Sequence, residues 1–315
     1  MEERQRIVVI GGPTASGKSA LAVELARDFG GEIVNADSMQ VYRGMDVGTA
    51  KPSPRQRAEV PHHLIDVVDP DEDFNAALYR SLALPILGDL TARGKVGFVV
   101  GGTGLYIQAL LGGLLPCPPV DGEFRRRLHQ DLEMQGTVAL HEKLKDLDPE
   151  SAERIHAHDR VRILRALEVI HLTKGRLSSM IRNHGFRERT FQAFKICLQM
   201  ERKELYHRID ERCIRMVEEG LVAETKGLLE KGYSPGLKPM KSLGYRHMIR
   251  VLKGEWDLET AIVQLQTDTR RYAKRQLTWF RADPGVVWFR PDEAEEIRER
   301  IRSFLSGAKS KRESP

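Results

Sequence analysis

A glycine-rich segment near the start of the chain carries the residues whose spacing is most specific for a chemical task. Its pattern is GxxxxGK[ST], with Gly12, Gly17, Lys18 and Ser19 at the fixed positions. Glycines allow backbone conformations with positive φ, so successive N–H groups can point inward at an anion. Lys18 is then expected to reach the outer phosphates of a ligand, and Ser19 to ligate a magnesium ion. A plain turn between a strand and a helix needs neither side chain, so the segment predicts a phosphate-binding site.

A second group of polar residues follows the apolar segment Glu32–Ala36. Asp37 stands at its end, where open parallel sheets place their ligands, and Ser38, Gln40 and Tyr42 come directly behind it. An aspartate in this position can also cap the next turn. A carboxylate, a flat amide and an aromatic ring so close together, across from a phosphate loop, could instead hold a base.

The apolar segment Val96–Val100 continues into the sequence GGTGLY. Phosphate-transfer enzymes with this type of loop usually have a magnesium-binding aspartate at the end of such a strand, and here none follows. The glycines suggest a close approach of backbone to ligand, and Thr103 offers a hydroxyl beside the phosphate loop. A tight turn whose threonine caps a helix explains the spacing equally well.

Alternating strands and helices are expected to carry these residues. Apolar runs predict strands at Ile7–Ile10, Glu32–Ala36, His63–Val67 and Val96–Val100. Helical periodicity predicts helices at Ser19–Arg27, Asn75–Arg93 and Leu105–Leu111. Such alternation favours an α/β fold, in which a parallel sheet is covered by helices on both faces.

The pattern changes after the prolines at 116, 118 and 119, where a charged and helical stretch begins. We interpret residues 121–189 as a helical insertion, with residues 1–120 and 190–315 forming the core. In the insertion, Val161, Leu164, Leu167, Val169 and Ile170 have the spacing of one apolar helix face. The segment after the insertion predicts a strand that rejoins the sheet, then two helical stretches, a long helix over about 258–280, a short strand and a terminal helix.

The composition sets broad limits on function. With 315 residues, 41% of them hydrophobic, the chain can bury a sizeable core, and its net charge of +5 is mild evidence for an anionic partner. The three cysteines fit neither a disulfide framework nor a zinc site. No signal region or membrane-length apolar stretch is present, so we expect a soluble, cytoplasmic protein without a membrane partner, and a monomer.

The motifs taken together resemble the tRNA dimethylallyltransferase family, which prenylates adenosine next to the anticodon. The resemblance runs in order from about Arg6 to about Phe289 and rests on the segments GPTASGKS, NADSMQVYRGMDVGTAKP, HHLIDVVDP, VGGTGLY, RALEV, GLVAE, LGYRH and TRRYAKRQLTWFR. DSMQVY together with GGTGLY is highly specific. Some eukaryotic relatives carry a zinc-finger extension for which this chain has no Cys/His pairing, so it resembles the bacterial form.

The resemblance implies which phosphates the loop holds. In that family the loop grips the diphosphate of dimethylallyl diphosphate, the leaving group, rather than a nucleotide, although backbone N–H groups can also accept ATP or another nucleotide. Arg212 is implied as a further clamp, Mg²⁺ as the cofactor, and Ser19 as its ligand. The diphosphate-binding set is Gly12, Pro13, Thr14, Ala15, Ser16, Gly17, Lys18, Ser19 and Arg212.

The resemblance also implies the catalytic and tRNA-binding groups. Asp37 is expected to orient the adenine amine and to accept its proton, while Lys18 and Thr103 meet the charge that develops on the diphosphate. The partner is the anticodon stem-loop of tRNA, with the target base flipped out of its stack. The basic side of the segment RRYAKRQLTWFR, with Arg270, Arg271, Lys274, Arg275 and Arg281, fits an RNA backbone. The expected tRNA contacts are Asp37, Ser38, Met39, Gln40, Thr103, Arg125, Val161, Arg162, Ile163, Leu164, Arg165, Arg271, Lys274 and Arg275.

Three other interpretations compete with this one. A metabolite or nucleotide kinase would use the phosphate loop for ATP but has no use for the basic C-terminal helix. A prenyltransferase acting on free adenine nucleotides would leave both the insertion and that helix without a role. An RNA-remodelling NTPase would need a magnesium-binding aspartate, supplied from a strand other than Val96–Val100.

Overall fold

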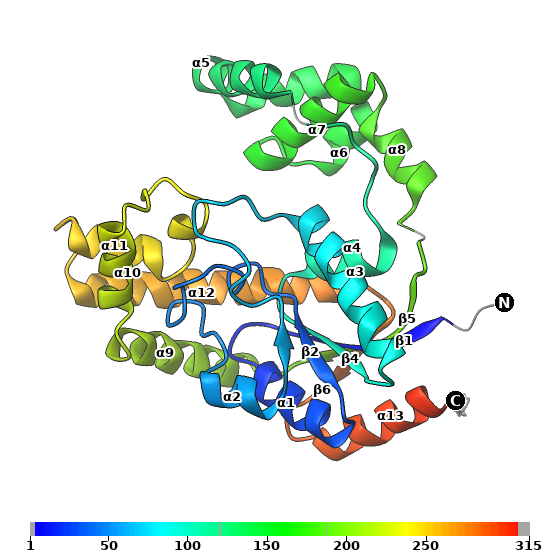
Figure 1. Ribbon diagram of the computed structural model, residues 1–315. Coiled ribbons are helices and arrows are strands. Elements are labelled where there is room, and N and C mark those ends of the chain that lie inside the picture. The colour runs from blue at the N-terminus through cyan, green and yellow to red at the C-terminus, as the bar shows by residue number, and fades with distance from the viewer. Residues whose placement is uncertain (1–3, 120, 187, 308–315) are drawn as a thin grey trace. The chain divides into compact units, whose positions relative to one another are not determined.

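The computed structural model describes residues 4–119, 121–186 and 188–307. The chain separates into two compact units, which we describe individually. The core unit comprises Met1–Leu111 and Arg189–Pro315, and the helical unit comprises Gly112–Glu188 (Figure 1). The expected boundary at residue 120 lies outside the described residues. No helix in the described ranges has the length and apolarity to cross a bilayer.

A parallel sheet of six strands forms the centre of the core unit. Its order is β3-β2-β4-β1-β5-β6, and every neighbouring pair is parallel. β1 is central, so the loop that follows it lies between the ends of β4 and β5. The strands are β1 Gln5–Gly11, β2 Glu32–Asn35, β3 His62–His63, β4 Gly97–Val100, β5 Phe191–Leu198 and β6 Val286–Phe289.

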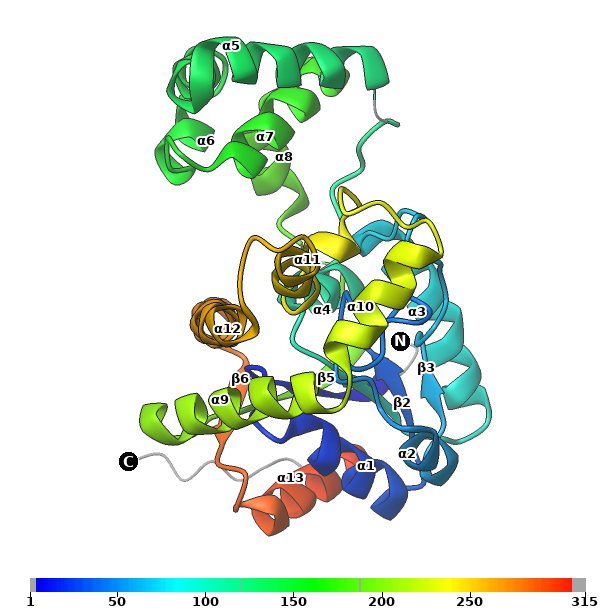
Figure 2. The same cartoon turned by 90° about the vertical axis from the view of Figure 1, so that its left-hand side faces the viewer.

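Helices cover both faces of this sheet, as the alternation of elements predicts. Ile7 and Val9 of β1 face a large apolar cluster, whereas Val8 and Ile10 face a second cluster on the opposite side. The second cluster is closed by α1 and α13, which lie side by side in Figures 1 and 2. The helices of the core unit are α1 Lys18–Asp28, α2 Pro54–Glu59, α3 Ala76–Ala92, α4 Gly104–Gly112, α9 Arg202–Glu218, α10 Leu221–Glu230, α11 Tyr245–Leu252, α12 Leu258–Arg281 and α13 Ala294–Ser306.

Two expectations about these elements are wrong. The pattern predicts a strand at His63–Val67, but β3 ends at His63, because Leu64 and Asp66 adopt positive φ angles of 60° and 56°, which a strand does not permit. The pattern also predicts two helical stretches before the long helix, but three α-helices and the 3-10 turn Pro239–Lys241 occur there. The extra helix, α11, has only eight residues and follows Gly244 at a φ of 89°.

The helical unit is built from α5 Gly122–Leu147, α6 Pro149–Arg154, α7 Arg160–Thr173 and α8 Leu177–His184. α5 breaks at Gly136, whose φ of 80° and ψ of 171° are not helical. Leucines of α5 pack against Ile163, Leu164 and Leu167 of α7 to form a separate small core. The apolar spacing places Val161 on this face, but Val161 is 76% exposed, and Ile163 takes the buried position instead.

Candidate active site

The loop between β1 and α1 has the geometry of an anion cradle. Gly12, Ala15 and Gly17 adopt φ angles of 145°, 64° and 87°, in the region that turns successive N–H groups to one side. Gly17 is the N-cap of α1 and supplies no side-chain hydrogen bond to the first turn, so the helix N-terminus is left for a ligand. The hydroxyl of Ser16 is buried without a hydrogen-bond partner among the described residues. These features fit a bound phosphate.

Lys18 lies close to two other charged side chains. Its Nζ donates to the carbonyl oxygen of Pro13 at 3.2 Å. The pKa of Lys18 is lowered to about 8, chiefly by burial and next by the Arg212 guanidinium, while the Asp37 carboxylate opposes the shift. Burial also lowers the pKa of Arg212, again opposed by Asp37. Two cations held so close together favour the arrival of an anion with more than one negative charge.

Asp37 is fixed at the carboxyl end of β2. Its Oδ1 accepts the N–H of Met39 at 2.8 Å, and its own N–H donates to Asn35 Oδ1 at 3.1 Å. Ser38 N–H donates to Thr103 Oγ1 at 3.0 Å, so the segment after β2 is tied to the segment after β4. The carboxyl ends of the neighbouring strands β2 and β4, both predicted from the sequence to carry site residues, are therefore joined directly.

Gln276 of α12 joins the phosphate loop to the GGTG segment. Its Oε1 accepts the N–H of Thr14 at 2.8 Å, and its Nε2 donates to the carbonyl oxygen of Gly102 at 3.1 Å. A Cβ on Gly102 would lie 2.0 Å from Gln276 Nε2, which explains the glycine. Gln276 is 5% exposed. Both loops are consequently held at fixed positions by one buried amide.

A cavity of about 320 Å³ connects these groups. Its lining includes most of the side chains expected to touch the donor or the acceptor base, and it adds apolar and polar groups from α9, α11 and α12. The expected lining residues are Thr14, Lys18, Ser19, Asp37, Ser38, Met39, Gln40, Arg212 and Arg275, and the additional ones include Asn35, Cys213, Met216, Arg246, Leu265, Thr269, Tyr272 and Gln276.

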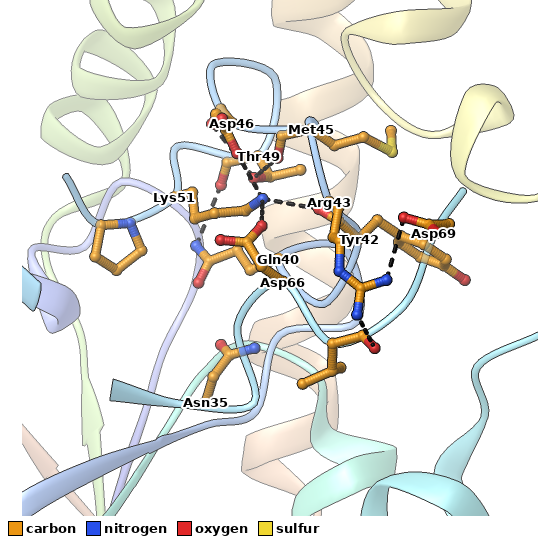
Figure 3. Close-up of polar contacts among 12 residues, drawn as sticks. Asn35, Gln40, Tyr42, Arg43, Met45, Asp46, Thr49, Lys51, Asp66 and Asp69 are labelled. Atoms are coloured by element: carbon orange, nitrogen blue, oxygen red, sulfur yellow. Dashed lines mark hydrogen bonds and ion pairs between the residues drawn. The ribbon is translucent and has the colours of Figure 1, made fainter. Parts of the chain in front are cut away.

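Gln40 is held by the loop that it precedes. Its Nε2 donates to the carbonyl oxygen of Thr49 at 3.2 Å (Figure 3). It also donates to the carbonyl oxygen of Ala50 at 3.2 Å. Both N–H groups of the amide are therefore used inside the protein. Gln40 lines the cavity, and its amide oxygen is the atom that remains to contact a ligand.

The basic residues of α12 differ in their surroundings. Arg271, Lys274 and Arg275 are exposed, and Arg275 also lines the cavity and lies over the Tyr272 ring at 5.7 Å. Arg270, which was expected to face an RNA backbone, instead pairs with Asp210 at 2.7 Å. The apolar positions Ala273 and Phe280 are buried, as the helical periodicity predicts.

In the helical unit, the expected RNA-contacting residues fall into two groups. Ile163 and Leu164 are buried in the core of the unit, 0% and 8% exposed, as the apolar spacing predicts for Leu164. Their expected contact with tRNA stays a prediction. Val161, Arg162 and Arg165 are exposed. Arg125 is bidentate to the buried Glu168, at 2.6 and 2.9 Å, and Arg165 reaches the same carboxylate at 3.2 Å.

The donor set of the cavity fits a magnesium ion held mainly by its substrate. Ser19 provides a hard hydroxyl oxygen, which Mg²⁺ prefers, and it lines the cavity. Within the described ranges, no group of three or more His, Cys, Asp or Glu side chains is arranged to hold a metal. Mg²⁺ commonly takes one or two protein ligands and completes its shell with phosphate oxygens and water.

Sequence reasoning missed several residues of the site. Gln276 could have been found, because it is a polar residue on the mostly apolar side of α12 that also carries Ala273 and Phe280. Tyr272 and Arg246 gave no comparable signal, since they reach the cavity only through the packing of α11 and α12.

The amino-acid sequence matches two known protein families. The model of the IPP transferase family matches residues 40–283, and the model of the isopentenyl transferases matches residues 5–62. The chain is 50% identical to tRNA dimethylallyltransferase 2 of Syntrophus aciditrophicus, over 97% of this chain and 98% of the relative. It is 52% identical to the tRNA dimethylallyltransferase of Geobacter sulfurreducens, over 90% and 92%.

Solved structures agree with the sequence comparisons. The full-length tRNA isopentenylpyrophosphate transferase of Bacillus halodurans is similar, with a TM-score of 0.72 and 40% identity over 97% of this chain and 98% of that one. A eukaryotic dimethylallyltransferase acting on tRNA is similar, with a TM-score of 0.80 and 27% identity over 98% of this chain and 81% of that one. By the family match and by these identities, the chain belongs to the IPP transferase family, among the tRNA dimethylallyltransferases.

Proposed function

We propose that this protein transfers a dimethylallyl group from dimethylallyl diphosphate to N6 of the adenosine that follows the anticodon in tRNA, on its 3′ side, and releases diphosphate. One observation carries the proposal. A single cavity is lined both by the phosphate loop, with Lys18 and Ser19, and by the strand end that holds Asp37 and Gln40. A kinase needs the first set of groups, but the second set is suited to a flat base with an amine.

The phosphate loop and two cations hold the donor in this proposal. The N–H groups of the loop and the N-terminus of α1 bind the diphosphate, and Lys18 and Arg212 face its oxygens. Ser19 would ligate Mg²⁺, which when bound neutralises charge on the diphosphate oxygens. The apolar part of the lining, which includes Met216 and Leu265, suits a short isoprenyl chain.

Asp37 acts on the acceptor. The amine of adenine is a weak nucleophile because its lone pair is delocalised into the ring, so a carboxylate that orients the amine and accepts its proton increases the rate. The bond from C1 of the dimethylallyl group to the diphosphate oxygen breaks, and its electron pair leaves with diphosphate. The N6–C1 bond forms, and the N6 proton passes to Asp37.

The charge that develops on the leaving group is met by groups that are already in position. The Arg212 guanidinium lies close enough to Lys18 to lower its pKa, and Thr103 Oγ1 accepts the N–H of Ser38. Preorganised cations and hydroxyl donors of this kind lower the barrier, because they need little reorganisation during the reaction.

The remaining expected contacts serve the polynucleotide. The target base must leave its stack, at a cost that is smallest in an unpaired loop. Arg271, Lys274 and Arg275 present exposed charge on α12, and the helical unit presents Val161 and the arginines Arg125, Arg162 and Arg165. We further propose that the protein acts as a monomer in the cytoplasm, because one chain supplies every catalytic group and the substrate is tRNA.

A transfer assay tests the proposal. Purified protein and Mg²⁺ are incubated with unmodified tRNA and radiolabelled dimethylallyl diphosphate, and in parallel with ATP labelled on its end phosphate. We expect label to enter tRNA and to be lost when the adenosine beside the anticodon is replaced. Release or transfer of phosphate from ATP, without incorporation of the prenyl group, would show instead that the loop serves a nucleotide.

A further inference from the structure

Glu224, in the segment GLVAE, makes four hydrogen bonds that the proposed chemistry does not use. Its Oε2 accepts the N–H groups of Asp46 and Val47 at 2.9 and 2.8 Å. Its Oε1 accepts the N–H of Gly48 at 3.0 Å and the hydroxyl of Tyr245 at 2.6 Å. One carboxylate on α10 thus holds three successive backbone N–H groups of a loop that is far away in the sequence.

Tyr245 encloses this contact. It is fully buried, and its pKa is raised, first by burial and next by the Glu224 carboxylate. A Cβ on Gly48 would lie 2.5 Å from the Tyr245 ring, so only glycine permits this approach. Gly48 lines the cavity. The loop is therefore packed closely against α10 and α11 at the residue where it lines the cavity.

Lys51 holds the same loop from the other side. Its Nζ donates to Asp46 Oδ1 and Asp66 Oδ1, both at 2.6 Å, and to the carbonyl oxygen of Tyr42 at 2.8 Å (Figure 3). All three N–H groups of the ammonium are used, and its side chain is 1% exposed. Asp46 is the junction, because its carboxylate meets Lys51 and its backbone N–H meets Glu224.

The contacts of Glu224 and Lys51 with this loop also fix the orientation of the Gln40 amide. The carbonyl oxygens that accept from its amide belong to Thr49 and Ala50, which directly follow the three N–H groups that Glu224 holds. As long as residues 46–50 stay in place, the amide cannot rotate without losing both bonds. Its oxygen, a hydrogen-bond acceptor, is then kept for an amine or N–H on the acceptor base.

We propose that Glu224 is a positioning residue that preforms the acceptor side of the cavity by bracing residues 46–50 behind Gln40. The inference rests on the proposed function, since it assigns Gln40 to the acceptor base. The four hydrogen bonds of Glu224 go to residues 46–48 and Tyr245, whereas the phosphate loop is held separately by Gln276. Loss of Glu224 should therefore affect the acceptor far more than the donor.

Steady-state kinetics with both substrates test this separation. In Glu224→Ala we expect kcat/KM for tRNA to fall by roughly tenfold or more, because small misplacements of reacting groups are costly, with KM for dimethylallyl diphosphate unchanged. For Glu224→Gln we expect a kcat/KM for tRNA between those of the wild type and Glu224→Ala, since its amide oxygen can still accept from Asp46 and Val47. Tyr245→Phe should show a smaller loss of the same kind.

Glu230→Gln is the matched control. It removes a carboxylate from the same helix, but Glu230 is exposed and lies 3.6 Å from Lys226, away from the loop. We expect it to leave both kinetic constants unchanged. A parallel rise in KM for both substrates of the Glu224 variants would indicate general destabilisation and would overturn the positioning role.

Hydrogen exchange provides a readout that does not depend on activity. The amides of Asp46, Val47 and Gly48 should be protected in the wild type and should exchange at least tenfold faster in Glu224→Ala, which removes every acceptor atom, while the amide of Thr14 is unaffected. Unchanged protection of residues 46–48 would refute the inference even if transfer to tRNA is found. Faster exchange in a protein that does not modify tRNA would retain the bracing and refute the proposed function.

Discussion

At the scale of single residues, the site depends on three charged side chains that line the same cavity. Lys18, Arg212 and Asp37 line one cavity, and Asp37 opposes the lowering of the pKa of both cations. A diphosphate that enters between the cations would favour their charged forms further. A base with its amine at Asp37 would then be next to the leaving group.

Replacing Asp37 with asparagine should separate chemistry from binding. Asn keeps an oxygen for the Met39 N–H, but it cannot accept the proton from N6. We expect the rate of transfer to fall by about 10²–10⁴-fold, the usual contribution of a general base, with little change in tRNA affinity. Single-turnover kinetics and a tRNA-binding assay measure the two effects. The exposed Asp71→Asn is the control, and normal turnover in the Asp37 variant would exclude it as the base.

At the scale of elements, the glycines after β4 permit close packing that side chains would prevent. A Cβ on Gly101 would lie 2.2 Å from the backbone carbonyl of Ala36, at the end of β2. A Cβ on Gly104 would lie 2.0 Å from the Trp279 ring of α12. The glycines of the GGTG segment are therefore needed for close packing, and Gly101 also lines the cavity.

Gly101→Ala should destabilise the core unit. Backbone atoms cannot rotate away from the new methyl group, so we expect a loss of about 1–3 kcal/mol or more in the free energy of unfolding. Gly88→Ala is the matched control, because it lies within α3 with no atom near its Cβ position and should stabilise by up to about 1 kcal/mol. Urea unfolding of both variants measures the difference. Equal stability of the two would contradict this account.

In the helical unit, the buried carboxylate of Asp148 contributes to the stability of the fold. It is fully buried, and it accepts hydrogen bonds from the N–H and hydroxyl groups of both Ser151 and Ser178. Burial by itself would raise the pKa of Asp148, but these four bonds hold it below the ordinary value of 3.8. The carboxylate therefore stabilises the fold above that value, and this contribution is lost as the pH falls through the lower folded-state pKa.

Asp148→Asn should accordingly show a pH-dependent loss of stability. Near neutral pH we expect the variant to be less stable by about 1–3 kcal/mol, because an amide cannot accept from all four donors. The difference from the wild type should shrink as the pH is lowered below 3.8. Thermal melts followed by circular dichroism across pH 3–7 measure it, and a difference that stays constant would show that the charge of Asp148 does not contribute.

At the scale of the whole molecule, the net charge of +5 matters through its distribution. Many arginines are paired inside the protein, as Arg270 is with Asp210 and Arg125 with Glu168. Arg271 and Lys274 are exposed on α12 and do not line the cavity. They are suited to contact phosphates of a long polyanion without affecting the chemistry.

Neutralising Arg271 and Lys274 should weaken tRNA binding in a salt-dependent way. In the double glutamine variant we expect the slope of log affinity against log salt to decrease by about 1 for each tRNA phosphate that the variant can no longer neutralise. Replacing Arg55 and Arg300, which are exposed elsewhere on the core unit, should leave the slope unchanged. Identical slopes in both variants would indicate that α12 is only a solvated surface.

The amino-acid sequence determined the features that are encoded locally. The phosphate loop is one continuous segment, so Gly12, Gly17, Lys18 and Ser19 could be recognised from their spacing, and their backbone geometry follows that pattern. The parallel α/β core was predictable for the same reason, since alternation and helical periodicity are properties of neighbouring residues. The motifs together also sufficed to indicate the family, which the comparisons confirm.

Only the tertiary structure decided which distant residues complete the site. Gln276 of α12 joins the loops after β1 and β4, and Glu224 of α10 braces the loop after β2, although both helices are remote from these loops in the sequence. Val161 was predicted to lie on the buried face of its helix but is 76% exposed, because the elements packed against a helix decide which of its apolar positions is buried. Contacts of this kind depend on long-range packing, and no local pattern of residues specifies them.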